Sequence, residues 1–142
     1  MKIAVVIPTY NEKENLPKIT QQIMSLPLDL KLLVIDDNSP DGTGLVAEEL
    51  AKQYKGRISV MHRTGKLGLG TAYISGFKNL LGTDADVIGQ MDADFSHPPE
   101  KLLEMAKALD EADIAEGSRY VPGGSLDEKW PLWRKWLSGF GN

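Results

Sequence analysis

The chain has 142 residues and a formal net charge of −4, and 42% of its residues are hydrophobic, as expected for one soluble globular domain with a buried core. This mildly acidic composition gives no support for broad electrostatic binding of nucleic acid, and we expect no such partner. The sequence has no cysteine, which excludes disulfides, a thiolate nucleophile and cysteine-based metal centres. Its apolar runs are too short to span a bilayer or to form the core of a secretory signal, so we expect a cytoplasmic protein.

Short apolar runs alternate with amphipathic stretches along most of the chain. The short runs are typical of strands buried on both faces of a parallel sheet, and we expect strands at Ile3–Ile7, Leu32–Ile35, Ile58–Met61, Val87–Met91 and Ile114–Ala115. Between them, apolar residues recur at helical spacing. Four helices are therefore expected, around Leu16–Met24, Leu45–Tyr54, Ala72–Leu80 and Leu102–Leu109. This alternation predicts an α/β fold with a mostly parallel sheet flanked by helices.

Turn residues and a change in composition divide the sequence further. Ser39-Pro40-Asp41-Gly42 predicts a turn, and Pro98-Pro99-Glu100 predicts the start of a helix. After position 120 we expect a glycine-containing loop and then an amphipathic helix that contains all three tryptophans of the chain. We therefore divide the chain into a domain at 1–120 and a segment at 121–142. The aromatic side of this amphipathic segment suits either a membrane interface or packing against the domain.

Polar residues follow nearly every expected strand, and several are acidic. Because ligands bind outside the carboxyl ends of parallel strands, these residues are candidates for a site. Asp92 and Asp94 follow one strand and suit a Mg²⁺ or Mn²⁺ ion that also contacts phosphate oxygens, although Asp-x-Asp is common and Asp also caps helices. Asp36 and Asp37 follow another strand, where they suit either contact with a base or ribose hydroxyl, or capping of the next helix.

Other polar residues give weaker indications. The glycine-rich run Gly65–Gly70 lacks the Ser or Thr of a phosphate-binding loop and the third glycine of a dinucleotide site. Arg119 follows the last expected strand and suits either a phosphate or a surface ion pair. His62 and His97 lie in no spacing that indicates a hydrolytic triad, and we interpret both as structural.

Six motifs in order resemble the family-2 glycosyltransferases, and closely the polyprenol-phosphate (dolichol-phosphate) mannose synthases. They extend over essentially the whole chain. They are Val6–Glu12, Asp36–Thr43, Gly68–Tyr73, Met91–Asp94 with Ser96-His97, Gly117–Tyr120, and the tail with Trp130, Arg134, Ser138 and Asn142.

The resemblance implies a GT-A (Rossmann-like) fold, GDP-mannose as donor, a polyprenyl or dolichyl phosphate as acceptor, and Mg²⁺ or Mn²⁺ as cofactor. It also implies roles for individual residues. The nucleotide pocket would be lined by Pro8, Tyr10 and Glu12, with Ile35 and Asp37 beside the base. The metal and diphosphate would be held by Asp92, Ala93 and Asp94, with Ser96 as a further metal contact and Arg119 on the donor. The residues expected to act in catalysis are Asp92, Asp94 and Arg119.

The expected activity is metal-dependent, inverting transfer of mannose from GDP-mannose to the lipid phosphate. We expect it at the cytosolic face of a membrane, with the protein bound peripherally. Members of the resembled family continue beyond the equivalent of Asn142, so a further C-terminal segment or a partner chain could complete the site. Two alternatives remain: glucosyl transfer from UDP-glucose to the same lipid, and a catalytically silent nucleotide-sugar-binding fragment. A nucleotidyltransferase would have a glycine- and lysine-rich motif near the N-terminus, which Pro8–Glu12 is not.

Overall fold

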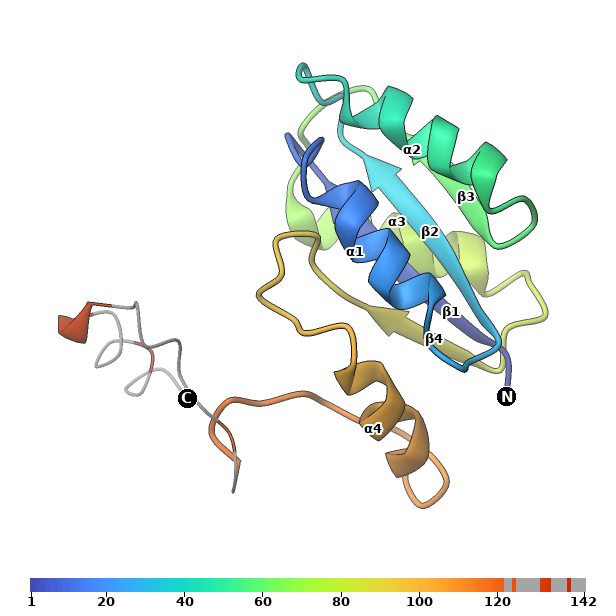
Figure 1. The fold of residues 1–142 in the computed structure, drawn as a ribbon, viewed down its shortest axis with the longest axis vertical. Coiled ribbons are helices and arrows are strands. Elements are labelled where there is room, and N and C mark those ends of the chain that lie inside the picture. Colours follow the sequence, from blue (N-terminus) through green and yellow to red (C-terminus); the bar gives the residue numbers. More distant parts are fainter. Residues whose placement is uncertain (122–123, 125–130, 134–137, 139–142) are drawn as a thin grey trace. The chain divides into compact units, whose positions relative to one another are not determined.

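A computed structural model describes residues 1–121, 124, 131–133 and 138 (Figure 1). The described chain forms two compact units, residues 1–104 and 105–142. The elements in chain order are β1 (Ile3–Thr9), α1 (Leu16–Met24), β2 (Leu30–Asp36), α2 (Thr43–Gln53), β3 (Ile58–His62), α3 (Leu69–Leu80), β4 (Val87–Gln90) and α4 (Lys101–Ala108). The first four expected strands and all four expected helices are confirmed. The domain boundary at 120 stays a prediction.

The described strands form one parallel sheet in the order β3-β2-β1-β4. The central strands β1 and β2 are buried along nearly their whole length, which explains their continuous apolar sequences. In register, Val6 of β1 pairs with Leu33 of β2 on one side and with Gln90 of β4 on the other. The chain winds outward from β1 in both directions, so the carboxyl ends of β1 and β4 flank a topological switch point, where open α/β sheets bind ligands.

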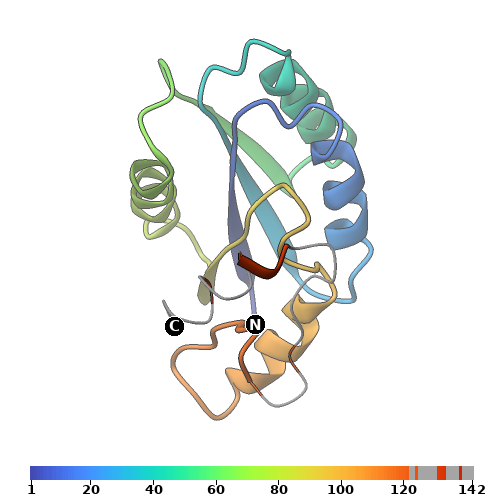
Figure 2. The same cartoon turned by 90° about the vertical axis from the view of Figure 1, so that its left-hand side faces the viewer.

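Helices cover both faces of this sheet in the first unit. Figure 2 shows α3 on one face and α1 with α2 on the other. Alternate residues of β1 and β2 form the core under α3, where they meet Ala72, Leu80, Tyr73 and Phe77. The approach is close at Gly76, because a Cβ there would lie 2.6 Å from Cγ1 of Val6. This glycine lets α3 lie directly on the sheet.

The expected fifth strand at Ile114–Ala115 is wrong. These residues are outside any strand, and Ile114 is 83% exposed. The run has only two apolar residues between Asp113 and Glu116, which is too little apolar surface to favour burial in a sheet.

The C-terminal tail is described in part. Trp133 is 68% exposed, while Trp130, Arg134 and Asn142 lie outside the described residues. Among the described residues, no helix is both long and apolar enough to cross a membrane.

Candidate functional site

The loops after β1 and β2 are joined by hydrogen bonds at the carboxyl edge of the sheet. The backbone N–H groups of Asn11, Glu12 and Lys13 donate to side chains of the loop after β2 and of the first residue of α2. Their acceptors are the Ser39 hydroxyl at 3.1 Å, the Thr43 hydroxyl at 2.9 Å and an Asp41 carboxylate oxygen at 3.2 Å. The left-handed conformation of Asn11, with φ at 61°, turns the chain toward these acceptors. The two loops therefore form one structured rim.

Asp36 is a structural part of this rim. Its side chain is buried and accepts hydrogen bonds from the Ser39 hydroxyl at 2.6 Å, the Ser39 N–H at 3.1 Å and the Thr9 hydroxyl at 3.3 Å. The capping role that was considered for Asp36 and Asp37 falls to Asp41. It lies at the start of α2 and accepts the Thr43 N–H at 2.9 Å. The hydrogen bond from the Thr43 hydroxyl contributes most to holding the pKa of Asp41 below its ordinary value, although slight burial opposes it.

Asp37 forms a buried ion pair that the sequence analysis missed. Its Oδ1 lies 3.2 Å from Nη1 of Arg63, and both side chains are 8% exposed. These two atoms form no aligned hydrogen bond, so their contact is electrostatic. Arg63 also donates from Nη2 to the Thr71 hydroxyl at 2.6 Å, and the other Asp37 oxygen accepts the Leu67 N–H at 3.4 Å. Asp37 is thus connected to both the glycine-rich loop and α3. The sequence signal that could have indicated this pair is the position of Arg63 directly after β3, at the same edge of the sheet as Asp37.

The loop after β4 contains Asp92 and Asp94. The last ladder bond, from the Met91 N–H to the Val6 carbonyl, holds the start of this loop beside β1. Asp92 is anchored twice: its Oδ1 accepts the Tyr73 hydroxyl at 2.5 Å, and its N–H donates to Nδ1 of His97 at 3.1 Å. Burial and then the bond to Asp92 raise the pKa of Tyr73, so this phenol stays protonated and is the donor.

Asp94 is more exposed than Asp92. Its Oδ1 accepts the Ser96 N–H at 2.9 Å. Partial burial favours the neutral acid, but the Ser96 hydroxyl and N–H, together with His97, outweigh it and hold the pKa of Asp94 below its ordinary value. Asp94 is therefore an anion at neutral pH, as a cation ligand must be.

These residues fit a divalent cation that is shared with an anionic ligand. The part of the chain that the structure describes has no group of three or more His, Cys, Asp or Glu residues that could enclose a metal. Two carboxylates and a nearby hydroxyl, those of Asp92, Asp94 and Ser96, instead make a partial set of oxygen donors. Mg²⁺ and Mn²⁺ at nucleotides are held in this way, with phosphate oxygens and water completing the coordination.

The remaining predicted residues lie in different surroundings. Tyr10 is exposed, and Nζ of Lys66 in the glycine-rich loop lies 4.3 Å from the centre of its ring, a cation–π contact that the sequence analysis also missed. Glu12 accepts a hydrogen bond from the Asn15 amide at 2.8 Å and lines an open hollow of about 330 Å³. Pro8 is half-buried beside this loop.

Ile35, Ala93 and Arg119 complete the predicted set. Ile35 is fully buried in the core under α3, so its side chain does not reach the surface of the site. Ala93, which lies between Asp92 and Asp94 in the sequence, is buried. Arg119 is exposed and belongs to the second unit. The roles of these three residues at the donor stay predictions.

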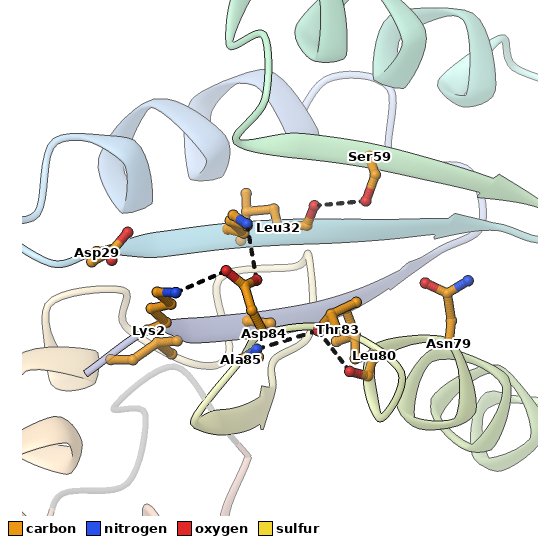
Figure 3. Close-up of a pocket in the computed structure, with 12 residues that line it drawn as sticks. Lys2, Asp29, Leu32, Ser59, Asn79, Leu80, Thr83, Asp84 and Ala85 are labelled. Carbon is orange, nitrogen blue, oxygen red and sulfur yellow. Dashed lines mark hydrogen bonds and ion pairs between the residues drawn. The ribbon is translucent and has the colours of Figure 1, made fainter.

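A second hollow, of about 110 Å³, lies at the opposite, amino edge of the sheet (Figure 3). Three of its charged groups form ion pairs: Nζ of Lys2 and of Lys31 lie 2.9 and 3.3 Å from the Asp84 carboxylate. The Thr83 hydroxyl donates to the Leu80 carbonyl at 2.7 Å. These contacts join the starts of β1 and β2 to the α3–β4 loop. We therefore interpret the charged residues of this hollow as structural.

This chain is similar to known proteins along most of its length. Residues 4–142 match glycosyl transferase family 2. The chain is 52% identical over 132 residues to a polyprenol monophosphomannose synthase of Mycolicibacterium smegmatis, covering 92% of this chain and 49% of that protein. It is 45% identical over 141 residues to a dolichol-phosphate mannosyltransferase of Pyrococcus furiosus, covering 97% of this chain and 38% of that protein. The chain thus spans about half, or less, of the length of these curated relatives.

A solved structure shares the fold. The mannosyltransferase PcManGT from Pyrobaculum calidifontis, determined with GDP-Man and Mn²⁺, superposes with a TM-score of 0.67 at 22% sequence identity. The match covers 76% of this chain and 32% of that one. The expected GT-A fold is confirmed.

Proposed function

The chain belongs to glycosyl transferase family 2, and we propose that it is the donor-binding part of an inverting mannosyltransferase. The donor is GDP-mannose and the acceptor is a polyprenyl or dolichyl phosphate. The observation that carries this proposal is the loop after β4, which brings Asp92 and Asp94 to the switch point of the sheet beside β1. The names of the curated relatives support the choice of sugar and lipid.

The nucleotide would lie along the rim made by the loops after β1 and β2. Tyr10 and Glu12 are available on this rim, and Asp37 is anchored behind it by Arg63. An anchored carboxylate suits the recognition of a base or ribose hydroxyl, because it keeps its position whether or not a ligand is present. Arg119 is kept as a candidate contact for the diphosphate, as the family resemblance implies.

The cofactor is Mg²⁺ or Mn²⁺, held by Asp92 and Asp94 with Ser96 as a further oxygen donor. When bound, such an ion stabilises the charge that grows on the leaving diphosphate. The Mn²⁺ in the PcManGT complex supports a divalent ion here. The choice between the two metals is part of the proposal.

The acceptor chemistry needs little help from the protein. A phosphate monoester, with a second pKa of about 6, is largely ionised at neutral pH and is already a nucleophile. Attack on the anomeric carbon from the side opposite the leaving diphosphate inverts its configuration. No general base is required, which fits a site whose acidic groups at the end of β4 would hold the metal.

The proposed acceptor is a lipid, so its phosphate is presented at a membrane surface. We propose that the enzyme works at the cytosolic face of a membrane, bound peripherally, and that the exposed Trp133 contributes to this contact. A C-terminal segment or a partner chain would complete the acceptor site.

A transfer assay tests the proposal. The chain is incubated with sugar-labelled GDP-mannose, undecaprenyl phosphate and Mn²⁺, and label is counted in the lipid extract. Once the C-terminal segment or partner chain that completes the acceptor site is supplied, we expect labelled lipid from the unaltered sequence and from Asp110→Asn, which changes an exposed carboxylate after α4. We expect none from Asp94→Asn. Label transferred from UDP-glucose instead would favour the glucosyl alternative. Metal-dependent donor binding without transfer would identify a silent binding fragment.

A further inference from the structure

We propose that Tyr73 is a positioning residue that fixes Asp92 for cation binding. This inference rests on the proposed function, because it assigns a role within the metal site. Tyr73 lies on α3, the helix that follows the glycine-rich loop in the chain. Its hydroxyl donates to Oδ1 of Asp92 at 2.5 Å. No other helix contributes a described side-chain contact to either carboxylate of this loop.

The anchoring of Asp92 comes from both sides of the residue. The phenol holds one carboxylate oxygen, and Nδ1 of His97 accepts the Asp92 N–H at 3.1 Å. Together they restrict the side-chain torsions and the backbone of Asp92. A carboxylate that is held by one oxygen presents the other in a fixed direction, so less conformational freedom is lost when a cation binds.

Tyr73 itself is well supported. It is half-buried in the core under α3, and its ring stacks against Phe77 with ring centres 6.2 Å apart. The rest of α3 is fixed to the sheet by the close approach of Gly76 to Val6. The phenol is therefore carried by a helix that packs closely on the sheet at Gly76, whereas Asp92 lies in an irregular loop.

A purely structural interpretation of the same contact is that Asp92 satisfies a half-buried hydroxyl. The two interpretations differ in what removal of the hydroxyl does. If the contact only satisfies Tyr73, its loss affects stability alone. If the contact positions Asp92, its loss weakens cation binding while leaving the nucleotide contacts intact.

The test measures Mn²⁺ affinity in the presence of saturating GDP, by calorimetry and by the electron paramagnetic resonance signal of free Mn²⁺. Tyr73→Phe removes the hydroxyl and keeps the ring against Phe77. We expect it to raise the Mn²⁺ dissociation constant by about 10-fold or more, while the affinity for GDP without metal changes less than about twofold. Tyr54→Phe is the matched control, because Tyr54 directly follows α2 at the amino edge of the sheet, and we expect it to leave both affinities unchanged.

The outcomes separate this inference from the proposed function. An unaltered Mn²⁺ affinity in Tyr73→Phe overturns the positioning role and leaves the proposed metal site intact. A parallel loss of metal-free GDP affinity also overturns it, because that result indicates a general disturbance of α3. Failure of the unaltered chain to bind Mn²⁺ with GDP overturns the metal site itself, and the role of Tyr73 with it.

Discussion

The buried pair of Asp37 and Arg63 gives the most direct test of the rim beneath the proposed nucleotide site. Its charged atoms are 3.2 Å apart, and both side chains are 8% exposed. At an effective dielectric constant of about 20, this separation corresponds to an attraction of about 5 kcal/mol, part of which offsets the desolvation of the two charges. Arg63→Met leaves the Asp37 carboxylate buried with a weak hydrogen bond from Leu67 at 3.4 Å. We expect this variant to lose about 3–5 kcal/mol of unfolding free energy.

A double-mutant cycle isolates the pair from the other contacts of Arg63. Urea unfolding is measured for Arg63→Met, Asp37→Asn and the double variant. The hydrogen bond from Arg63 to Thr71 is lost in both variants that lack the arginine, so it cancels in the cycle. We expect a coupling energy of about 2–3 kcal/mol. Lys101→Met, in an exposed ion pair with Glu104, is the control and leaves the unfolding midpoint nearly unchanged. A coupling energy below about 0.5 kcal/mol would refute the reasoning, because it would show that the two charges do not stabilise one another.

Three further predictions concern the core, the metal site and the amino edge. Gly76→Ala places a Cβ 2.6 Å from Val6 and should cost about 1–3 kcal/mol in urea unfolding through overpacking. Gly65→Ala, with nothing within 4 Å, is its control, and equal costs would contradict the packing argument. Asp94→Ala should abolish Mn²⁺-dependent binding of GDP-mannose, and calorimetry that finds unchanged affinity would remove this carboxylate from the site. Hydrogen bonds and ion pairs with Lys2 and then Lys31 lower the pKa of Asp84 to about 2. The stabilisation from Asp84 is therefore complete above the unfolded pKa of about 4 and is lost as the pH falls toward 2. Asp84→Asn should flatten the acid limb of thermal stability in this range, less so in about 1 M salt, and an unchanged limb would show that these ion pairs add no stability.

Much of the fold follows from the sequence because the central strands are buried on both faces. Leu32–Ile35 could be identified without an alignment, since few other structures bury such a continuous apolar run. The carboxyl edge followed in turn from the parallel arrangement, which places the residues after each strand on one side. The two-residue run at Ile114 lacked this burial signal, and the expectation of a strand there was wrong.

Contacts between separate segments could not be predicted in the same way. Tyr73 belongs to an apolar helical stripe, and nothing in that spacing shows that its hydroxyl bonds Asp92. Arg63 and Asp37 follow different strands, and their pairing depends on the register of β2 with β3. The roles of Asp36, which shapes the loop, and Asp41, which lies at the start of α2, were likewise decided by side-chain geometry.

The measurement that tests the central claim most directly is calorimetric titration of the chain with GDP-mannose and with UDP-glucose, each with and without Mn²⁺. We predict that GDP-mannose binds, that its binding depends on the metal, and that UDP-glucose does not bind. Binding of UDP-glucose in preference would contradict the assigned donor. Metal-independent binding would contradict the role of Asp92 and Asp94, and a folded chain that binds neither nucleotide sugar would contradict the claim that these residues form a donor site.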